Sequence, residues 1–443
     1  MRSLVVISLL LALVAYLFSE LTRPDLLLVG TITVDLVDQD GQRPGGAVSY
    51  AAAVLKAYGI RACVVTVAGP DADLSVFRGH ELHVVPSPST LTFEHSYAWF
   101  GHQRKLRVTA NPNITLSRRH VPRHCQRART VILGPLTLHE LDAASFLEYD
   151  GLWDQLYRGR QAVGLMAQGF QRRLAADGRV LPLQTPSPQL LAGLGHWRRV
   201  TLFLSDVETE TWAEDWLGLV VGAAERVLIT RGAQGATEYN DTGVTAIDVV
   251  PVDKVKDTNG AGDTFATGYM LALSRGLADP AHHAAWAASR AVMQPQSCKP
   301  QCAGDLIAGH VPPWGPADRL AGAWRGLAEV GLGLVEAAAR EGLAALMHVR
   351  RLPAGALAAA VARAAESELD GEGTLGEGEL GRVRSGAGGG HGKGQAKGQA
   401  KGGSAGGKGH VLSGQEGAGA SVAEARRLRE EAAAKDQWQS AGR

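Results

Sequence analysis

The chain has 443 residues, and its 45 lysines and arginines nearly balance its 44 aspartates and glutamates. This balance gives no electrostatic reason to expect nucleic acid or an anionic membrane as the principal partner. The mean hydropathy of −0.04 excludes a protein with many membrane spans. The four cysteines are too few for a disulfide scaffold. We expect reduced thiols at Cys63 and Cys125, and no zinc site at Cys298 and Cys302, because no second pair completes one.

Residues 4–18 form an uncharged apolar run, LVVISLLLALVAYLF. A helix needs about 20 apolar residues to cross a bilayer, so the run is short for a span, whereas its length suits the apolar region of a signal peptide. No A-x-A-like cleavage site follows it. We interpret residues 1–24 as a hydrophobic leader or anchor, with an imperfect gene start as the alternative, and leave them out of the fold prediction.

From residue 25 to about residue 302, short apolar runs alternate with helical stretches. Residues 45–59 are rich in alanine, have helical periodicity and end at Gly59, a residue suited to closing a helix. Runs this apolar are typical of strands buried on both faces of a parallel sheet. The pattern predicts an α/β domain with a doubly wound, mostly parallel sheet flanked by helices. The predicted strands lie in residues 26–37, where the strand ends at Gly30, and in 61–69, 130–134, 162–169, 200–205 and 226–232.

One segment, residues 89–108, follows a different period. Its large apolar side chains alternate with small or polar ones, which predicts a half-exposed hairpin that turns near Gly101. We expect this hairpin to form a small β-lid outside the main sheet, with an ordinary edge hairpin as the alternative. The alternating apolar residues are Leu91, Phe93, Tyr97 and Trp99.

The last third of the chain differs in composition. Residues 303–370 are rich in alanine and predict a helical extension. Residues 371–410 contain 17 glycines and no aromatic residue, so they cannot bury enough apolar surface to offset the entropy of ordering. We therefore interpret residues 371–443 as a low-complexity tail, with an isolated charged helix at 421–439.

The sharpest chemical signal is the segment Asp-Thr-Asn-Gly-Ala-Gly-Asp at residues 257–263, directly before a helical stretch. Small residues allow close approach of the backbone to a ligand, and amides at a helix start lack carbonyl partners within the helix. With the helix dipole, they can hold an anion such as a transferring phosphoryl group. Asp263 lies at the same helix start, where its carboxylate can meet a substrate hydroxyl. The alternative role for Asp257 and Asp263 is helix N-capping.

This DTNGAGD segment resembles the signature of the ribokinase-like, or pfkB, carbohydrate kinase family, and the resemblance extends over residues 26–302. It implies that Asp263 is the catalytic base. It implies ATP and Mg²⁺ as cofactors, with K⁺ as a further candidate for a monovalent-cation site at Asp257. It also implies an anion hole formed by the backbone of Gly260, Ala261 and Gly262.

Other segments are similar to the family in the same order. Residues 230–235, Thr-Arg-Gly-Ala-Gln-Gly, resemble its nucleotide loop. Phe93 and Glu94 lie in the segment that resembles its lid. The resemblance implies substrate contacts at Asp35, Gly45, Gly46 and Asp263. It implies ATP contacts at Thr230, Gly232, Gly235, Gly260 and Gly262.

Two positions depart from the family pattern. The N-x-x-E motif appears as Ser205-Asp206-Val207-Glu208, so only Glu208 is transferred, as a residue that holds Mg²⁺ through water. The asparagine usually found four residues after the Gly-Gly pair is Tyr50, which indicates a polyol or ring other than ribose.

A likeness to one subgroup of the family indicates which molecule accepts the phosphoryl group. Residues 134–147, 165–173 and 228–239 resemble plant-type myo-inositol 3-kinases, although Gln168 and Arg172 replace part of a D-x-N-x-R pattern common in sugar kinases of the family. We therefore expect ATP-dependent phosphorylation of a small polyol, myo-inositol first. The alternatives are another sugar or nucleoside kinase, and a catalytically silent scaffold.

The expected partners are the polyol and ATP, without nucleic acid. Membrane contact is expected only through residues 4–18, so the predicted location is the cytoplasm, with a membrane-anchored or organellar location as the alternative. The sequence leaves monomer and dimer open.

Overall fold

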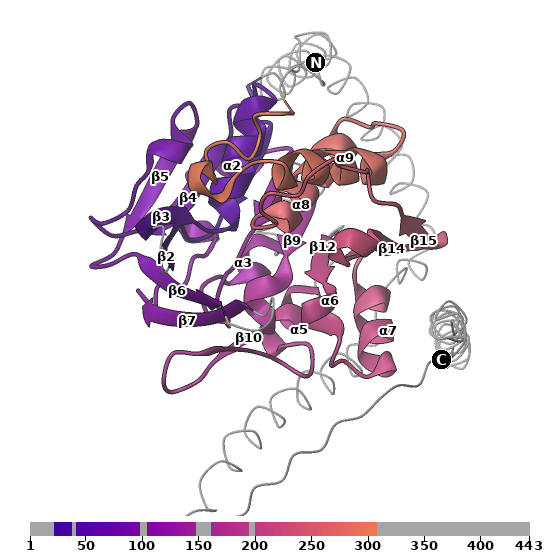
Figure 1. Cartoon of the computed structure of the whole chain (residues 1–443), viewed down its shortest axis with the longest axis horizontal. Helices are drawn as coiled ribbons and strands as arrows, with labels where there is room; N and C mark the ends of the chain where they lie inside the picture. Colours follow the sequence, from indigo (N-terminus) through magenta and orange to yellow (C-terminus); the bar gives the residue numbers. More distant parts are fainter. Residues whose placement is uncertain (1–21, 38–40, 98–103, 148–160, 195–199, 308–443) are drawn as a thin grey trace, which may run out of the picture.

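The computed structural model describes residues 22–37, 41–97, 104–147, 161–194 and 200–307. The centre of the fold is one large sheet with helices on both faces (Figure 1). The predicted apolar run at 4–18, the helices predicted beyond residue 307 and the low-complexity tail lie outside the described residues. Within the described ranges, every helix is too short or too polar to cross a membrane.

The main sheet confirms the predicted fold class. Its nine strands have the order β15-β14-β13-β12-β9-β8-β1-β4-β5. Neighbours from β13 to β5 all pair in parallel, and only β14 runs antiparallel to its neighbours, β13 and β15. The strands are β1 (Leu26–Val29), β4 (Cys63–Ala68), β5 (Glu81–Pro86), β8 (Thr130–Leu133), β9 (Ala162–Met166), β12 (Val200–Ser205), β13 (Arg226–Thr230), β14 (Ala236–Asn240) and β15 (Gly243–Ile247).

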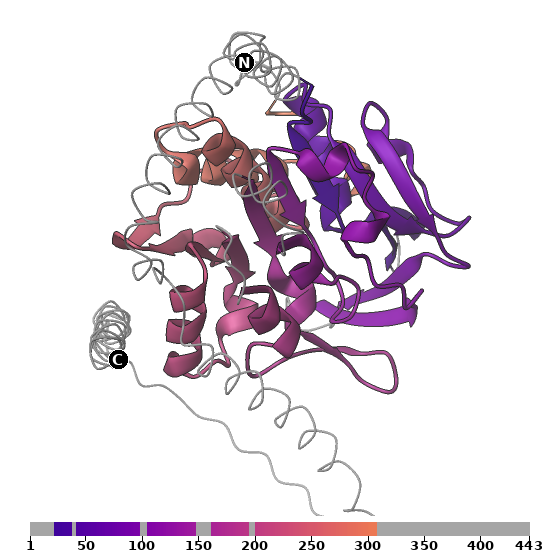
Figure 2. The ribbon, with the colours of Figure 1, turned by 180° about the vertical axis from the view of Figure 1, so that it is seen from behind.

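Helices cover both faces of this sheet, because its central strands are apolar on both sides. Leu26 and Leu28 of β1 belong to a core with α2, α8 and α9, whereas Leu27 and Val29 belong to a second core with α3, α5 and α7. Figure 2 shows the layers from behind. The helices are α2 (Ala47–Ala57), α3 (Ala143–Leu147), α5 (Pro188–Leu194), α6 (Asp206–Thr209), α7 (Glu214–Ala223), α8 (Ala261–Ser274) and α9 (Pro280–Val292). Short 3₁₀ turns include η1 (Ser75–Phe77), η2 (Arg118–His120), η3 (Cys125–Arg127), η4 (Ala167–Gln171), η5 (Gly232–Gln234) and η6 (Gln296–Cys298).

A separate four-stranded sheet contains the predicted hairpin. It has the order β3-β2-β6-β7, and β6 and β7 pair antiparallel as the period of two predicts. The turn predicted near Gly101 lies outside the described residues. The strands are β2 (Thr33–Val37), β3 (Gly41–Gly45), β6 (Leu91–Tyr97) and β7 (Arg104–Ala110), and a further small pair is β10 (Arg172–Leu174) with β11 (Val180–Pro182).

The apolar run 26–37 divides between the two sheets. The main-sheet strand ends at Val29, and Thr33–Val37 pairs with the lid strands instead. Gly30 allows this change of course, because a Cβ at this position would lie 2.5 Å from the carbonyl oxygen of Gly134. Residues that follow β1 in sequence are therefore brought into the lid.

The cysteines differ from the prediction of reduced thiols. The structure pairs Cys63 with Cys125, whose Cα atoms are 6.0 Å apart, and Cys298 with Cys302, at 5.6 Å. The first pair forms because η3, which precedes β8, lies beside the first residue of β4. A separation of 62 residues hides this proximity in the sequence.

Candidate active site

The DTNGAGD segment forms the turn that leads into α8. Gly260 precedes the helix with a left-handed φ of 72°, and a Cβ there would overlap the ring of Tyr50. The sequence placed the whole Gly-Ala-Gly segment before the helix, but α8 begins at Ala261. Gly262 therefore belongs to the first turn, and Asp263 is the third residue of the helix. Only glycine combines this φ with this contact at Gly260.

The first turn of α8 has the general properties of an anion cradle. Its amides have no carbonyl four residues earlier within the helix, and they lie at the positive end of the helix dipole. A Cβ at Gly262 would meet no atom within 4 Å, so a ligand can approach the backbone there. The amide of Ala261 is already engaged, because it donates to the carbonyl of Thr258 at 3.2 Å. Of the three predicted anion-hole residues, Gly262 has the most open backbone.

The carboxylate of Asp263 is held by a side chain from another strand end. Gln168, in the η4 turn after β9, donates through Nε2 to Asp263 Oδ1 at 3.2 Å. Arg172 in turn donates to Gln168 Oε1 at 2.8 Å and to the carbonyl of Leu136 at 3.2 Å. The two residues that replace part of a family pattern thus connect to the predicted catalytic base.

A buried glutamate fixes the loop that Arg172 contacts. Glu140 accepts hydrogen bonds from the backbone amides of Thr31 at 2.8 Å, Leu136 at 2.8 Å and Thr137 at 3.1 Å. It joins the loop after β1 to the loop after β8, next to the predicted substrate region. Sequence analysis missed Glu140, because its partners are backbone groups that no sequence motif marks.

Asp257 lies beside a buried lysine. Lys299 Nζ donates to the carbonyls of Asp257 at 2.8 Å and Asn259 at 3.0 Å, and it lies 3.4 Å from Asp257 Oδ2. The lysine side chain is fully buried. Burial lowers the pKa of Lys299, and the Asp257 carboxylate opposes that shift.

A K⁺ ion does not fit the monovalent-cation site predicted at Asp257. The oxygen atoms that Asp257 and Asn259 would offer to a monovalent cation already face the ammonium group of Lys299. An ammonium ion and K⁺ both need a cage of oxygen ligands, and one position cannot hold both. No motif marks Lys299 in the sequence, because it lies more than 35 residues after the DTNGAGD segment.

Asp35 lies in the small sheet, on β2, and it is buried. Its Oδ1 accepts a hydrogen bond from Thr33 Oγ1 at 2.7 Å, and its Oδ2 lies 3.5 Å from Nε2 of buried His95. In the parallel pairing of β2 with β6, Asp35 lies opposite Phe93. A Cβ at Gly45 would fall on the Asp35 carboxylate, so this predicted substrate residue leaves room for that carboxylate.

The second glycine of the Gly45-Gly46 pair lies directly before α2. Gly46 precedes the helix with a φ of 90°, and a Cβ there would lie 2.6 Å from the carbonyl oxygen of Thr31. Phe93 is buried, whereas Glu94 is partly exposed and lies 3.8 Å from Arg107 on the neighbouring lid strand. The lid residue that faces the interior is therefore Phe93.

Tyr50 connects the lid and the motif. This buried side chain of α2 packs against Gly260. Burial raises the pKa of the Tyr50 hydroxyl well above its usual value, and the carboxylates of Asp35, Asp263 and Asp257 raise it further. The shift indicates that Tyr50 lies in the same region of the fold as the three predicted carboxylates. The position that departs from the family pattern is at the centre of this region.

The predicted nucleotide loop follows β13. Gly232 and Gly235 have φ values of 52° and 82°, and a Cβ at Gly235 would collide with the carbonyl oxygen of Ile247. The amide of Arg231 closes the turn by donating to the carbonyl of Gly235 at 2.7 Å. Thr230 is the last residue of β13, and its Oγ1 donates to the carbonyl of Leu204 on β12 at 3.4 Å. The loop is therefore a fixed turn at the end of the sheet.

Glu208 lies on α6, directly after β12. Its Oε2 accepts hydrogen bonds from the amide and the hydroxyl of Ser205, both at 2.5 Å, in a capping box. Ser205, which replaces the family asparagine, thus orients the glutamate. The carboxylate is partly exposed at the carboxyl end of the sheet, and oxygen ligands of this kind suit Mg²⁺. The residue fits a role in holding that ion, although capping alone also accounts for its position.

The predicted residues therefore share one end of the sheet. Parallel strands have their carboxyl ends at a common edge, which is where ligands bind in open α/β sheets. Gln168, Glu208 and the 230–235 loop follow β9, β12 and β13, and the start of α8 contacts Tyr50 of α2.

Comparison with known proteins agrees with this arrangement. Residues 203–302 match the sequence family described as pfkB family carbohydrate kinase, which confirms the resemblance over the segment that contains Glu208, the 230–235 loop and the DTNGAGD turn. The matched segment does not include Asp35, Gly45 or Gly46.

Solved structures with a similar fold include three kinases. A pyrophosphate-dependent kinase in the ribokinase family, complexed with a pyrophosphate analog and myo-inositol, is 17% identical, with coverage of 66% of this chain and 98% of that chain and a TM-score of 0.47. The Burkholderia thailandensis nucleoside kinase in complex with inosine is 16% identical, with coverage of 65% and 100% and a TM-score of 0.47. Arabidopsis thaliana ribokinase complexed with ribose and ATP is 17% identical, with coverage of 68% and 98% and a TM-score of 0.46.

Proposed function

We propose that the protein is a pfkB-type kinase that transfers the γ-phosphoryl group of ATP to a hydroxyl of a small polyol, with myo-inositol as the first candidate. The main support is the turn at residues 257–263, which joins an anion cradle to a positioned carboxylate at the carboxyl end of the sheet. A capping residue needs no glutamine from another strand end to orient it. Asp263 has one.

In the proposed reaction, Asp263 accepts the proton of the attacking hydroxyl as the new bond to phosphorus forms. Gln168 holds Asp263 Oδ1, so the carboxylate keeps its orientation before the substrate arrives. The first-turn amides of α8, foremost that of Gly262, stabilise the negative charge on the phosphoryl oxygens. Glu208 would hold Mg²⁺ through water, and the ion would supply positive charge to the phosphates. Thr230, Gly232 and Gly235 are proposed to contact ATP.

The acceptor side is proposed around Asp35. Its buried carboxylate can accept hydrogen bonds from substrate hydroxyls, and the missing side chain of Gly45 leaves the space that this carboxylate occupies. Gly45 and Gly46 are proposed to contact the substrate through their backbone. Tyr50 occupies space beside Gly260 and narrows this region, which supports a compact ring over a nucleoside. The lid strands β6 and β7 would exclude water during transfer.

The rival functions are another sugar or nucleoside kinase and a silent scaffold. A phosphorylation screen of the full chain separates them: ATP or pyrophosphate is the donor, and myo-inositol, ribose, fructose and adenosine are the acceptors. Mass spectrometry of the products gives the readout. We expect phosphorylated myo-inositol with ATP. Binding of MgATP by calorimetry without any product would support the scaffold, and product from adenosine alone would support a nucleoside kinase. Consumption of cytosolic ATP fits the predicted cytoplasmic location, which stays a proposal.

A further inference from the structure

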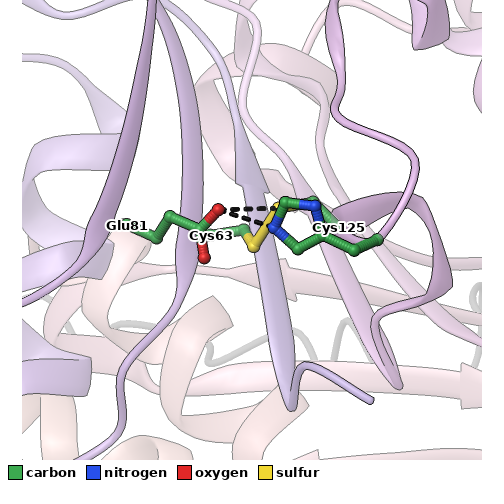
Figure 3. A group of neighbouring side chains, drawn as sticks. Cys63, Glu81 and Cys125 are labelled. Carbon is green, nitrogen blue, oxygen red and sulfur yellow. Dashed lines mark hydrogen bonds and ion pairs between the residues drawn. A yellow bond between two sulfur atoms is a disulfide. The ribbon is translucent and has the colours of Figure 1, made fainter. Parts of the chain in front are cut away.

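Five polar side chains converge at the opposite, amino end of the sheet. We call them the amino-end cluster: Cys63, Glu81, His83, His124 and Cys125. Cys63 and Glu81 are the first residues of β4 and β5 and face each other in the parallel register. Cys125 comes from η3, before β8. Figure 3 shows Cys63, Glu81 and Cys125 pointing toward one another from three separate segments.

The cluster is denser than a disulfide requires. His124 Nε2 lies 2.6 Å from Glu81 Oε1 and 3.3 Å from Cys125 Sγ. His83 Nε2 approaches the same carboxylate oxygen at 2.8 Å. One ligand atom from each of Cys63, Glu81, His124 and Cys125 lies within 4.8 Å of all the others. A disulfide between two cysteines gives no reason for two imidazoles and a carboxylate to surround it.

We propose that Cys63, Glu81, His124 and Cys125, with both cysteines as thiolates, form a tetrahedral zinc site at the amino end of the sheet. Zinc in proteins takes cysteine sulfur, histidine nitrogen and carboxylate oxygen, almost always in fours at structural sites. This cluster offers all three ligand types. His83 contacts the ligand Glu81 from outside, as residues next to zinc ligands commonly do.

The distances fit this set with a small local change. Zinc bond lengths of about 2.3 Å to sulfur and about 2.0–2.1 Å to nitrogen or oxygen, at a tetrahedral angle, separate sulfur from nitrogen or oxygen by roughly 3.6 Å. The Cys125 sulfur lies 3.3 Å from His124 Nε2 and 3.8 Å from Glu81 Oε1. The Cα separation of 6.0 Å between the cysteines is compatible with bonded sulfurs, and also with sulfurs that each turn toward a metal. Conversion therefore needs side-chain rotation and a widening of the Glu81–His124 contact.

The burial pattern gives the metal an entry path. Cys63 and Cys125 are buried in the apolar core, which restricts water at the sulfurs. The side chains of His124 and Glu81 are 54% and 31% exposed, so an ion can arrive from solvent through the imidazole and carboxylate. The bound metal would join β4, β5 and η3, and it would stabilise the end of the sheet that is remote from the proposed phosphoryl transfer.

The disulfide and the zinc site are two forms of one cysteine pair. A dithiol reductant opens the disulfide by supplying two electrons and two protons, and is itself oxidised to a disulfide. When Zn²⁺ binds, the two thiols release two protons, and the metal keeps its oxidation state. A reducing compartment thus favours the zinc form, and an oxidising one favours the disulfide.

The test uses the full chain, purified with a dithiol reductant. We expect one zinc per chain by elemental analysis. We also expect a thiolate-to-cobalt charge-transfer band and tetrahedral d–d bands on replacement with Co²⁺, and a lower Tm after chelation. A Cys298→Ser/Cys302→Ser background removes the other cysteine pair from the spectra, and His282→Ala is a matched surface-histidine control.

The variants assign the ligands. Cys63→Ser and Cys125→Ser should remove the charge-transfer band, and His124→Ala and Glu81→Gln should each lose tight binding. His83→Ala should weaken affinity by about 10- to 100-fold, as expected for a residue outside the ligand set. If the cysteine variants do not fold, the partly exposed His124 and Glu81 still test the site. No metal in the reduced protein, or parental affinity in both His124→Ala and Glu81→Gln, would overturn the proposal, as would a Cys63–Cys125 disulfide that persists in the reductant.

Discussion

The two ends of the main sheet are built from different kinds of residue. The carboxyl end has glycine turns with left-handed φ values, a helix start and carboxylates that accept hydrogen bonds from neighbouring side chains. The amino end has the amino-end cluster, whose members contact one another directly. The carboxyl end therefore leaves backbone and carboxylates available to ligands, whereas the amino end uses its polar side chains to join segments.

This difference predicts that the carboxyl end serves catalysis and the amino end serves stability. Substitutions at the carboxyl end should change catalysis with little effect on folding, and substitutions in the amino-end cluster should change stability or metal content with little effect on catalysis. In a parallel sheet the ligand-binding loops follow the strands, so the preceding loops can be made rigid without closing the site. The predictions below test the carboxyl end of this comparison.

The largest expected effect is that of Asp263→Asn. Asp263 is the third residue of α8 rather than its N-cap, so asparagine keeps the size of the side chain and loses only a charge near the helix dipole, worth about 0.3–1 kcal/mol. Tm should therefore change little, while the proton acceptor is lost. General-base contributions are about 10²–10⁴-fold, and kcat should fall by that factor with ATP affinity retained. Tm, ATP binding by calorimetry and turnover on the best polyol are the measurements.

Asp257→Asn is the control for that variant, because Asp257 faces Lys299 rather than the proposed reaction centre. It should alter stability more than proton transfer. Turnover of Asp263→Asn near the parental rate would remove Asp263 as the base, and an unfolded variant would make it a structural residue of the first turn of α8.

Lys299→Met should lower both stability and catalysis, although it lies at the carboxyl end of the sheet, because the charge of Lys299 is buried next to the DTNGAGD turn. The variant leaves Asp257 and two carbonyls without their ammonium partner. Removing one member of a buried ion pair costs about 3–5 kcal/mol of unfolding free energy. We expect a loss of that order by denaturant titration, with reduced kcat, and partial recovery of both in high K⁺ or NH₄⁺.

Lys254→Met, which removes an exposed lysine, is the matched control and should resemble the parent. Activity of the parent protein should not depend on K⁺, because the ammonium group already occupies the oxygen ligands. A strict K⁺ requirement in the parent would show that the cation binds elsewhere, and that Lys299 does not replace it.

Asp35→Ala should have an intermediate effect, confined to the acceptor. Hydrogen bonds to a charged group are worth about 1.5–3 kcal/mol, or roughly ten- to a hundredfold in KM. Initial rates should show this rise in polyol KM with ATP KM unchanged. Asp305→Ala, on an exposed carboxylate, is the control. An unchanged KM for every polyol would make Asp35 a structural partner of Thr33 and His95.

The sequence predicts what is local in the chain. Six of the nine main-sheet strands (β1, β4, β8, β9, β12 and β13), the helix predicted at 45–59 and the turn before Asp263 each depend on neighbouring residues, and each overlaps its predicted range. The strands β5, β14 and β15 were not predicted. The resemblance to the pfkB family likewise rests on contiguous motifs. The residues that determine each of these features are therefore neighbours in the sequence.

What the sequence could not predict depends on register and on distant contacts. Glu140 bonds to amides of two loops, and Lys299 bonds to carbonyls about 40 residues earlier. The amino-end cluster exists only because β4 and β5 pair with Cys63 opposite Glu81, and because η3 reaches the same edge. A cysteine count cannot show this, so both cysteine pairs were unexpected.

The smallest effect should come from removing residues 311–443. The described core ends with Ala303 and Ile307, which are buried in the core that contains α2, and a Cβ at Gly304 would lie 2.6 Å from that of Ala57. A chain that stops at residue 310 keeps these contacts, whereas one that stops at 302 loses them. We expect the chain that ends at residue 310 to retain kcat, KM and Tm. The chain that ends at residue 302 should lose stability, because two buried apolar side chains are removed.

If the chain ending at 310 is insoluble or inactive, the predicted helices beyond it complete the core. If both truncations behave like the parent, the packing of Ile307 contributes nothing measurable. Comparing the two therefore locates the boundary of the folded domain to within eight residues, independently of the proposed acceptor.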